Sequence, residues 1–170
     1  MTCLREQLPY RLCVGIMVLN DDNKVWIGKR IARNQTQYEQ SQKRWQMPQG
    51  GIKKNENPVL ASLRELYEET GIHNVGLITQ TNDWLTYDLP NHLIGYSLRG
   101  KYRGQKQKWF VYRFKGNENE IRIKPITQDY YAEFETWCWE EMNKLPTLIV
   151  DFKRPLYEDL ITRFSYLSKQ

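Results

Sequence analysis

The sequence predicts an α/β fold in which a mixed β-sheet is covered by α-helices. Short apolar segments bounded by turn residues are interleaved with two segments of helical periodicity, which is the pattern of that fold class. The chain has 170 residues, and one domain of that length buries about 70% of its unfolded surface. Hydrophobic residues make up 40% of it and charged residues 26%, as in globular proteins. No internal repeat or linker divides it, so we expect a single domain over residues 1–170.

Six segments have the length and composition of β-strands. The first two are separated by the turn sequence Asn20-Asp21-Asp22-Asn23. The expected strands are residues 12–19, 25–29, 75–79, 84–87, 108–114 and 136–139.

Two helices are expected between and after these strands. Asn57 can cap the first, Pro58 suits its first position and Gly71 marks its end, so it covers residues 58–70. The second begins at Pro155 and carries an apolar stripe, which consists of Leu156, Leu160, Ile161, Phe164 and Leu167.

The helix over residues 58–70 has an apolar face and an acidic one. At about 100° per residue, the expected buried face holds Leu60, Leu63, Leu66 and Tyr67, and the opposite face holds Glu65, Glu68 and Glu69 beside Arg64. An ordinary solvated face explains these acids, because like charges at i,i+4 cost only about 0.2–0.5 kcal/mol. If they lined a cleft, they would instead hold a hard divalent cation, magnesium or manganese, since zinc would call for histidine or cysteine.

The scarcity of other reactive side chains leaves carboxylates as the main candidates for chemistry. Three cysteines without a C-x-x-C pair and two distant histidines argue against structural zinc, a disulfide framework and a histidine-activated nucleophile. The longest apolar runs fall well below the ~18 residues that span a bilayer, and no signal peptide is visible. We expect a soluble cytoplasmic protein with no membrane partner.

Basic residues are concentrated in two stretches of a chain whose net charge is +5. Residues 24–44 and 99–108 are rich in Lys and Arg, and aromatic residues are interleaved with them or border them. A solvated surface explains either stretch alone. Together they indicate a polyanion with stackable bases.

The spacing around the acidic helix identifies a motif. Residues 50–72 resemble the Nudix box, G-x5-E-x7-R-E-U-x-E-E-x-G-U with U aliphatic, at all nine specified positions. The resemblance implies a Nudix fold, with the mixed sheet sandwiched between helices, and a loop–helix–loop that binds divalent cations and hydrolyses a nucleoside diphosphate linked to another group. It places Glu65, Glu68 and Glu69 at the metal. It also makes Glu68, Glu69 and Arg64 catalytic, has Glu56 and Arg64 brace the loop, and has the chain turn at Gly50 and Gly71.

Further motifs narrow the resemblance to the bacterial RNA pyrophosphohydrolases, which are relatives of the dinucleoside polyphosphate hydrolases. The matching segments include residues 10–15, 45–52, 84–90, 104–110, 133–134 and 152–154. The resemblance implies phosphate contacts for Arg11, Arg30, Gln105 and Lys153, a substrate contact for Tyr87 and base stacking for Phe152. It makes Glu133 a further metal ligand or the catalytic base. Residues 32–43 depart from the pattern, because this loop is longer than expected and leaves the role of Arg44 open.

The expected activity is therefore metal-dependent hydrolysis of a pyrophosphate linkage, with Mg²⁺ or Mn²⁺ as cofactor. The preferred substrate is the 5′ triphosphate end of RNA, trimmed to a monophosphate. A dinucleoside tetra- to hexaphosphate is the alternative substrate. A noncatalytic nucleotide-binding Nudix module is an alternative of another class, and the intact set of Glu65, Glu68, Glu69 and Glu133 argues against it. The sequence leaves the identity of any accessory protein partner open.

Overall fold

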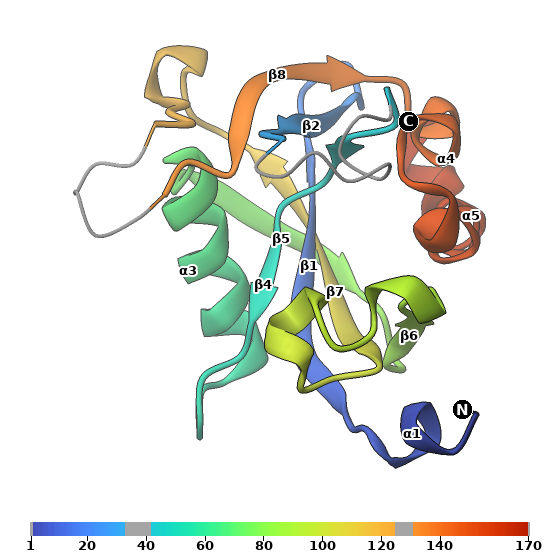
Figure 1. Ribbon diagram of the computed structural model, residues 1–170. Coiled ribbons are helices and arrows are strands. Elements are labelled where there is room, and N and C mark those ends of the chain that lie inside the picture. Colours follow the sequence, from blue (N-terminus) through green and yellow to red (C-terminus); the bar gives the residue numbers. More distant parts are fainter. Residues whose placement is uncertain (1, 33–41, 125–130, 170) are drawn as a thin grey trace.

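The computed structural model describes residues 2–32, 42–124 and 131–169, and most of the unusual loop at residues 32–43 lies outside these ranges (Figure 1). At its centre two long strands, β1 (Tyr10–Leu19) and β7 (Gly104–Phe114), run parallel. They belong to an eight-stranded mixed sheet with the main order β3-β2-β1-β7-β5, in which β4 also pairs with β1, β6 with β7 and β8 with β2. The predicted α/β class with a mixed sheet is confirmed.

The six predicted strands are all present. The remaining strands of the sheet are β2 (Val25–Arg30), β3 (Trp45–Gln46), β4 (Gln49–Gly51), β5 (Val75–Gln80), β6 (Leu85–Asp88) and β8 (Phe134–Glu140). The sequence did not indicate β3 and β4, which are too short to show a period. The predicted start of β7 was four residues too late, because the first part of that strand is polar. Gln105 and Gln107 in this part are nevertheless buried.

Helices cover both faces of the sheet, with α3 (Pro58–Thr70) on one side and α4 (Leu145–Leu148) and α5 (Arg154–Phe164) on the other (Figure 1). A short helix, α1 (Thr2–Gln7), precedes the sheet. The 3₁₀ turns are η1 (Asn91–Leu93), η2 (Ser97–Gly100), η3 (Glu118–Glu120), η4 (Met142–Lys144), η5 (Asp151–Lys153) and η6 (Ser165–Lys169). None of the described helices is long and apolar enough to cross a bilayer.

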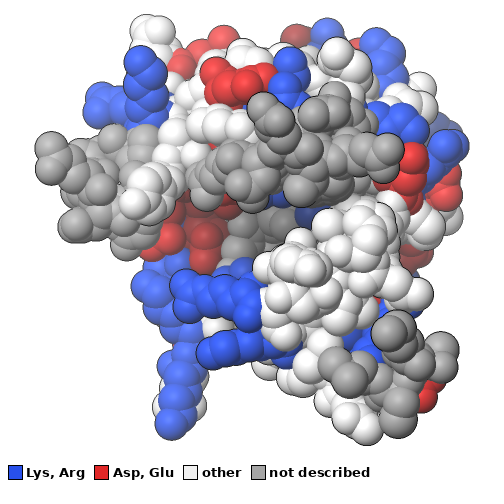
Figure 2. All heavy atoms as spheres, in the orientation of Figure 1, with Lys and Arg blue, Asp and Glu red and all other residues white. Residues whose placement is uncertain are grey.

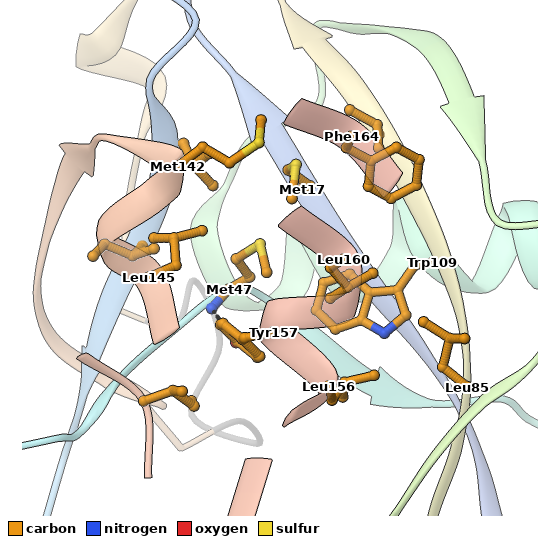
Figure 3. Close-up of a cluster of buried hydrophobic side chains, with 14 of the residues drawn as sticks. Met17, Met47, Leu85, Trp109, Met142, Leu145, Leu156, Tyr157, Leu160 and Phe164 are labelled. Carbon is orange, nitrogen blue, oxygen red and sulfur yellow. Dashed lines mark hydrogen bonds between the residues drawn. The ribbon is translucent and has the colours of Figure 1, made fainter. Parts of the chain in front are cut away.

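Each face of the sheet has its own hydrophobic core, because successive side chains of a strand point to opposite faces. On β1, Met17 and Leu19 join the core under α4 and α5, where Trp109, Tyr157 and Leu160 also pack (Figure 3). The intervening β1 side chains join the core under α3, which contains Val14, Ile16, Val18, Trp26, Leu66, Phe110 and Tyr112. The central strands are therefore covered on both faces.

The ends of α3 lie where the sequence predicts them. The side chain of Asn57 accepts a hydrogen bond from the backbone N–H of Val59 at 2.8 Å, and Pro58 is the first helical residue. Gly71 ends the helix with a φ of +71°, a conformation that side chains disfavour.

The predicted orientation of α3 is wrong in part: Leu66 is buried and Leu63 packs against the core as predicted, but Leu60 and Tyr67 do not. Leu60 is 62% exposed and Tyr67 46%, whereas Ala61, Ser62 and Leu66 are fully buried. The helix is rotated so that Ala61 and Ser62 approach the sheet, and the Ser62 hydroxyl bonds to that of Tyr112 at 2.6 Å. The rotation points Glu65 and Glu69 inward rather than to open solvent. Apolar periodicity could not show this, because the buried face includes carboxylates.

Arg64 joins α3 to the loop that precedes it. Its Nε and Nη2 donate to the two carboxylate oxygens of Glu56 at 2.7 and 2.9 Å, and Nη2 also donates to the Gly51 carbonyl at 2.9 Å. The hydrogen bonds from Arg64 lower the pKa of Glu56 to about 2. This paired contact holds the loop against the helix.

The orientation of α3 predicts opposite outcomes for two leucines on the same helix. Leu66→Ala should lower the free energy of unfolding by about 2–5 kcal/mol, because it opens a cavity in a packed core. Leu60→Ala should change it by less than about 0.5 kcal/mol, since most of its side chain is in water. Urea unfolding followed by circular dichroism measures both, and equal losses would contradict the orientation.

The Glu56–Arg64 pair predicts a pH-dependent contribution to stability. Glu56→Gln should lower the free energy of unfolding by about 1–3 kcal/mol at pH 7, because a charged hydrogen-bond acceptor is lost. The pKa of Glu56 in the folded protein lies below its ordinary value of 4.5. The loss of unfolding free energy in Glu56→Gln should therefore be complete above pH 4.5 and should shrink as the pH falls towards 2.

Urea unfolding at a series of pH values measures this difference. Glu158→Gln is the matched control, because Glu158 belongs to an exposed ion pair within a helix and should matter by no more than about 0.5 kcal/mol. A loss for Glu56→Gln that stays constant from pH 7 to pH 2 would contradict the pairing.

Candidate active site

A cavity of about 480 Å³ brings together most of the residues singled out in the sequence. Those that line it are Arg11, Arg30, Gly50, Glu65, Glu69, Tyr87, Gln105, Glu133, Phe152 and Lys153. Glu68 lines a second hollow of about 160 Å³, which shares Glu65, Glu69 and Glu133 with the first. Three of the predicted residues line neither hollow. Arg64 and Glu56 lie behind the carboxylates, and Gly71 lies at the end of α3. Figure 2 shows acidic atoms at the bottom of a hollow on this face, with Lys and Arg side chains nearby.

The sheet register explains why residues far apart in the sequence meet here. Gln105 on β7 lies opposite Arg11 on β1 and opposite Tyr87 on β6, so three adjacent strands each contribute one side chain. The turn η5 adds Phe152 and Lys153, and α3 adds its inward carboxylates.

The carboxylates of the cavity crowd one another. Glu69 is held by the backbone N–H of Gln49 at 3.2 Å, and burial raises its pKa well above the usual value, with Glu133 and Glu65 adding to the shift. Burial also raises the pKa of Glu65. Gly50 makes room for this packing, because a Cβ there would lie 2.0 Å from the Glu65 carboxylate.

Basic side chains pair with three of the four carboxylates, namely Glu65, Glu68 and Glu133. Arg64 Nη1 donates to Glu65 at 2.7 Å and to Glu68 at 3.1 Å, and Arg30 donates to Glu133 at 2.9 Å from Nε and 2.8 Å from Nη2. In the described part of the chain, no three acidic, histidine or cysteine side chains form a ready metal-ligand group. The residues still fit a hard divalent cation, because the donors are carboxylate oxygens and a cation would relieve the repulsion around buried Glu69.

Two cations face the cavity without an ion-pair partner among the residues that the structure describes, namely Arg11 and Lys153. Lys153 is 3% exposed and donates to Gln46 Oε1 at 3.3 Å, and its Nζ lies 5.2 Å from the centre of the Tyr87 ring. Burial, reinforced by Arg30, lowers the Lys153 pKa to about 7. A bound anion would favour its charged form.

Aromatic side chains form one wall. The rings of Tyr87 and Phe152 are 5.8 Å apart at an angle of 44°. Tyr87 belongs to the core under α4 and α5 as well as to the cavity, whereas Phe152 is only partly buried. The wall therefore joins a buried ring to a more accessible one.

Several cavity residues were not anticipated individually. Gln46 and Gln49 lie in the segment over residues 45–52 and line the cavity. Nothing in the sequence shows that these two residues of the segment, rather than their neighbours, reach it. The segment before β7 adds an apolar wall that consists of Leu89, Leu93, Tyr96 and Leu98. No periodic pattern marks this wall, because the segment is built from 3₁₀ turns and contains residues with positive φ.

Comparison with known proteins matches this geometry to a family. A model described as NUDIX domain matches residues 9–160. An RNA pyrophosphohydrolase of Agrobacterium fabrum is 53% identical over 168 residues, covering 99% of both chains, and one of Brucella anthropi is 54% identical over 162 residues, covering 95% of this chain and 93% of its own. The crystal structure of a MutT protein from Methanosarcina mazei superposes with a TM-score of 0.61 at 17% identity, covering 96% of this chain and 99% of its own. The family model spans most of the chain and its defining box forms the carboxylate-bearing helix of the cavity, so this chain belongs to the Nudix family.

Proposed function

We propose that this Nudix hydrolase removes pyrophosphate from the 5′ triphosphate end of RNA and leaves a 5′ monophosphate. The observation that carries the proposal is the pairing of opposite charges in one cavity, where Arg11 and Lys153 face the carboxylates Glu65, Glu69 and Glu133. A polyphosphate chain complements the cations, and divalent cations complement the carboxylates. The relatives from Agrobacterium fabrum and Brucella anthropi carry the name RNA pyrophosphohydrolase, which supports RNA as the substrate.

Glu65, Glu68, Glu69 and Glu133 are the residues that would hold Mg²⁺ or Mn²⁺. When bound, such ions neutralise charge that develops on the phosphate oxygens and acidify a water molecule. The protein part of the mechanism is positioning. Arg11 and Lys153 hold the nonreacting phosphates while a water oxygen bonds to phosphorus and the bridging P–O bond breaks.

Two further roles follow from the contacts around the cavity. Arg30 is paired with Glu133, so a phosphate that draws Arg30 away would free the Glu133 carboxylate to take the proton of the attacking water or to join the metal ligands. Phe152 is the accessible ring of the aromatic wall and would stack on a base of the RNA, with Tyr87 behind it.

Replacing a buried carboxylate should separate activity from stability. Glu69→Gln should reduce turnover at least about 100-fold, because a charge that serves transition-state stabilisation is lost. Its melting temperature should equal or exceed that of the unmodified protein, since a crowded buried charge is removed. Glu141→Gln, on an exposed carboxylate outside the cavity, is the control and should retain full activity. Near-normal turnover in Glu69→Gln would remove Glu69 from the site.

A comparison of substrates tests the reaction itself. With Mg²⁺ or Mn²⁺, kcat/KM should rise from a triphosphorylated mononucleotide to a dinucleotide and a longer oligonucleotide, because the leaving chain is then held and oriented. Product analysis should show RNA with a 5′ monophosphate, and EDTA should abolish turnover reversibly. If diadenosine tetraphosphate is hydrolysed faster than every RNA, dinucleoside polyphosphates replace RNA as the substrate. Tight nucleotide binding without turnover would instead identify a noncatalytic module.

A further inference from the structure

A hydrogen-bonded chain of side chains runs from the buried core beneath the cavity to the cavity wall. The indole Nε1 of Trp109 donates to Oε1 of Gln107 at 2.9 Å. Nε2 of Gln107 donates to Oε1 of Gln105 at 2.7 Å and to Oε1 of Gln49 at 3.1 Å. Trp109 and Gln107 are fully buried, whereas Gln105 and Gln49 line the cavity.

The chemistry of the indole sets the direction of every bond in this chain. An indole nitrogen can donate a hydrogen bond but cannot accept one, so the atom of Gln107 that faces it must be the carbonyl oxygen. The amide nitrogen of Gln107 then points the other way, and its two hydrogens require acceptors. Gln105 and Gln49 must therefore present their own oxygens to Gln107.

We infer that Gln107 is a positioning residue that turns the NH₂ groups of Gln105 and Gln49 towards the substrate. The oxygens of these two amides accept hydrogen bonds from Gln107. Among the described residues, Nε2 of Gln105 and Nε2 of Gln49 have no hydrogen-bond acceptor. The cavity thus receives two oriented N–H donors, which suit the nonbridging oxygens of a phosphate chain. With the amides flipped, their oxygens would face those phosphate oxygens and repel them.

The strand geometry gives the indole its place. Trp109 lies opposite Gly15 in the parallel pairing of β7 with β1, and a Cβ at Gly15 would lie 2.2 Å from the indole ring. The absence of a side chain at Gly15 therefore lets the ring lie across β1. Gln105, Gln107 and Trp109 alternate along β7, so they share one face of that strand. This inference rests on the proposed function, because it assigns a role within the same cavity.

The test uses a phosphate probe that is not hydrolysed, imidodiphosphate with Mg²⁺, and calorimetry to measure its Kd. Gln107→Glu keeps an acceptor for Trp109 but cannot donate as a carboxylate, so both cavity amides turn round, and the Kd should rise about tenfold. Trp109→Phe changes no charge and removes only the donor that sets the direction, so the Kd should rise about threefold. Gln80→Glu, the same substitution at an exposed position of β5, controls for added charge and should leave the Kd unchanged.

Nuclear magnetic resonance of the unmodified protein supplies a readout that does not depend on the variants folding. The probe should shift the side-chain N–H signals of Gln49 and Gln105, and both Nε2 hydrogens of Gln107 should exchange slowly with solvent. On triphosphorylated RNA, folded Trp109→Phe should raise KM more than it lowers kcat. Rapid exchange at Gln107, or a wild-type Kd in folded Gln107→Glu and Trp109→Phe, overturns the inference. If the Kd for imidodiphosphate rises in Gln107→Glu but the unmodified protein releases no pyrophosphate from RNA, the orienting role of Gln107 stands and only the assignment of RNA as substrate fails.

Discussion

The guanidinium group of Arg64 is the interaction on which the arrangement of this site depends. All five of its N–H groups are used: two on Glu56, one on the Gly51 carbonyl, and one each on Glu65 and Glu68. One planar group thereby fixes the loop before α3 and two carboxylates of that helix at once. A lysine could not replace it, because an ammonium group has three donors and no fixed plane.

The central parallel pair of strands extends this constraint to the rest of the cavity. Pairing of β1 with β7 places Arg11 beside Gln105, and antiparallel pairing with β6 adds Tyr87. Because both faces of the two central strands are covered by cores, their side chains have little freedom to move. The packed strands therefore fix the backbone from which Arg11, Gln105 and Tyr87 reach the cavity.

The charges of the cavity are arranged for a ligand that carries both signs. Lys153 is buried without an ion pair within the described part of the chain, and Glu69 is buried among other carboxylates. Each arrangement is unfavourable in the protein alone, since an uncompensated buried charge is costly. A polyphosphate together with divalent cations would compensate both charges, which is the physical reason that this cavity suits such a substrate.

The sequence by itself determined the α/β class, the ends of α3 and the family, because capping residues, strand composition and the nine positions of the box are local signals. It also named most of the residues that line the cavity. Only the tertiary structure decided that Leu60 and Tyr67 face solvent while Glu65 and Glu69 face inward, since the face of a helix that packs on a sheet depends on the neighbouring strands as well as on its own apolar period. Only the structure brought Gln107 and Trp109 beneath Gln49 and Gln105, because that contact requires β4 and β7 on either side of β1 and an open position at Gly15. Local patterns encode where an element begins and ends, whereas the direction in which a buried amide points depends on neighbours that are distant in the chain.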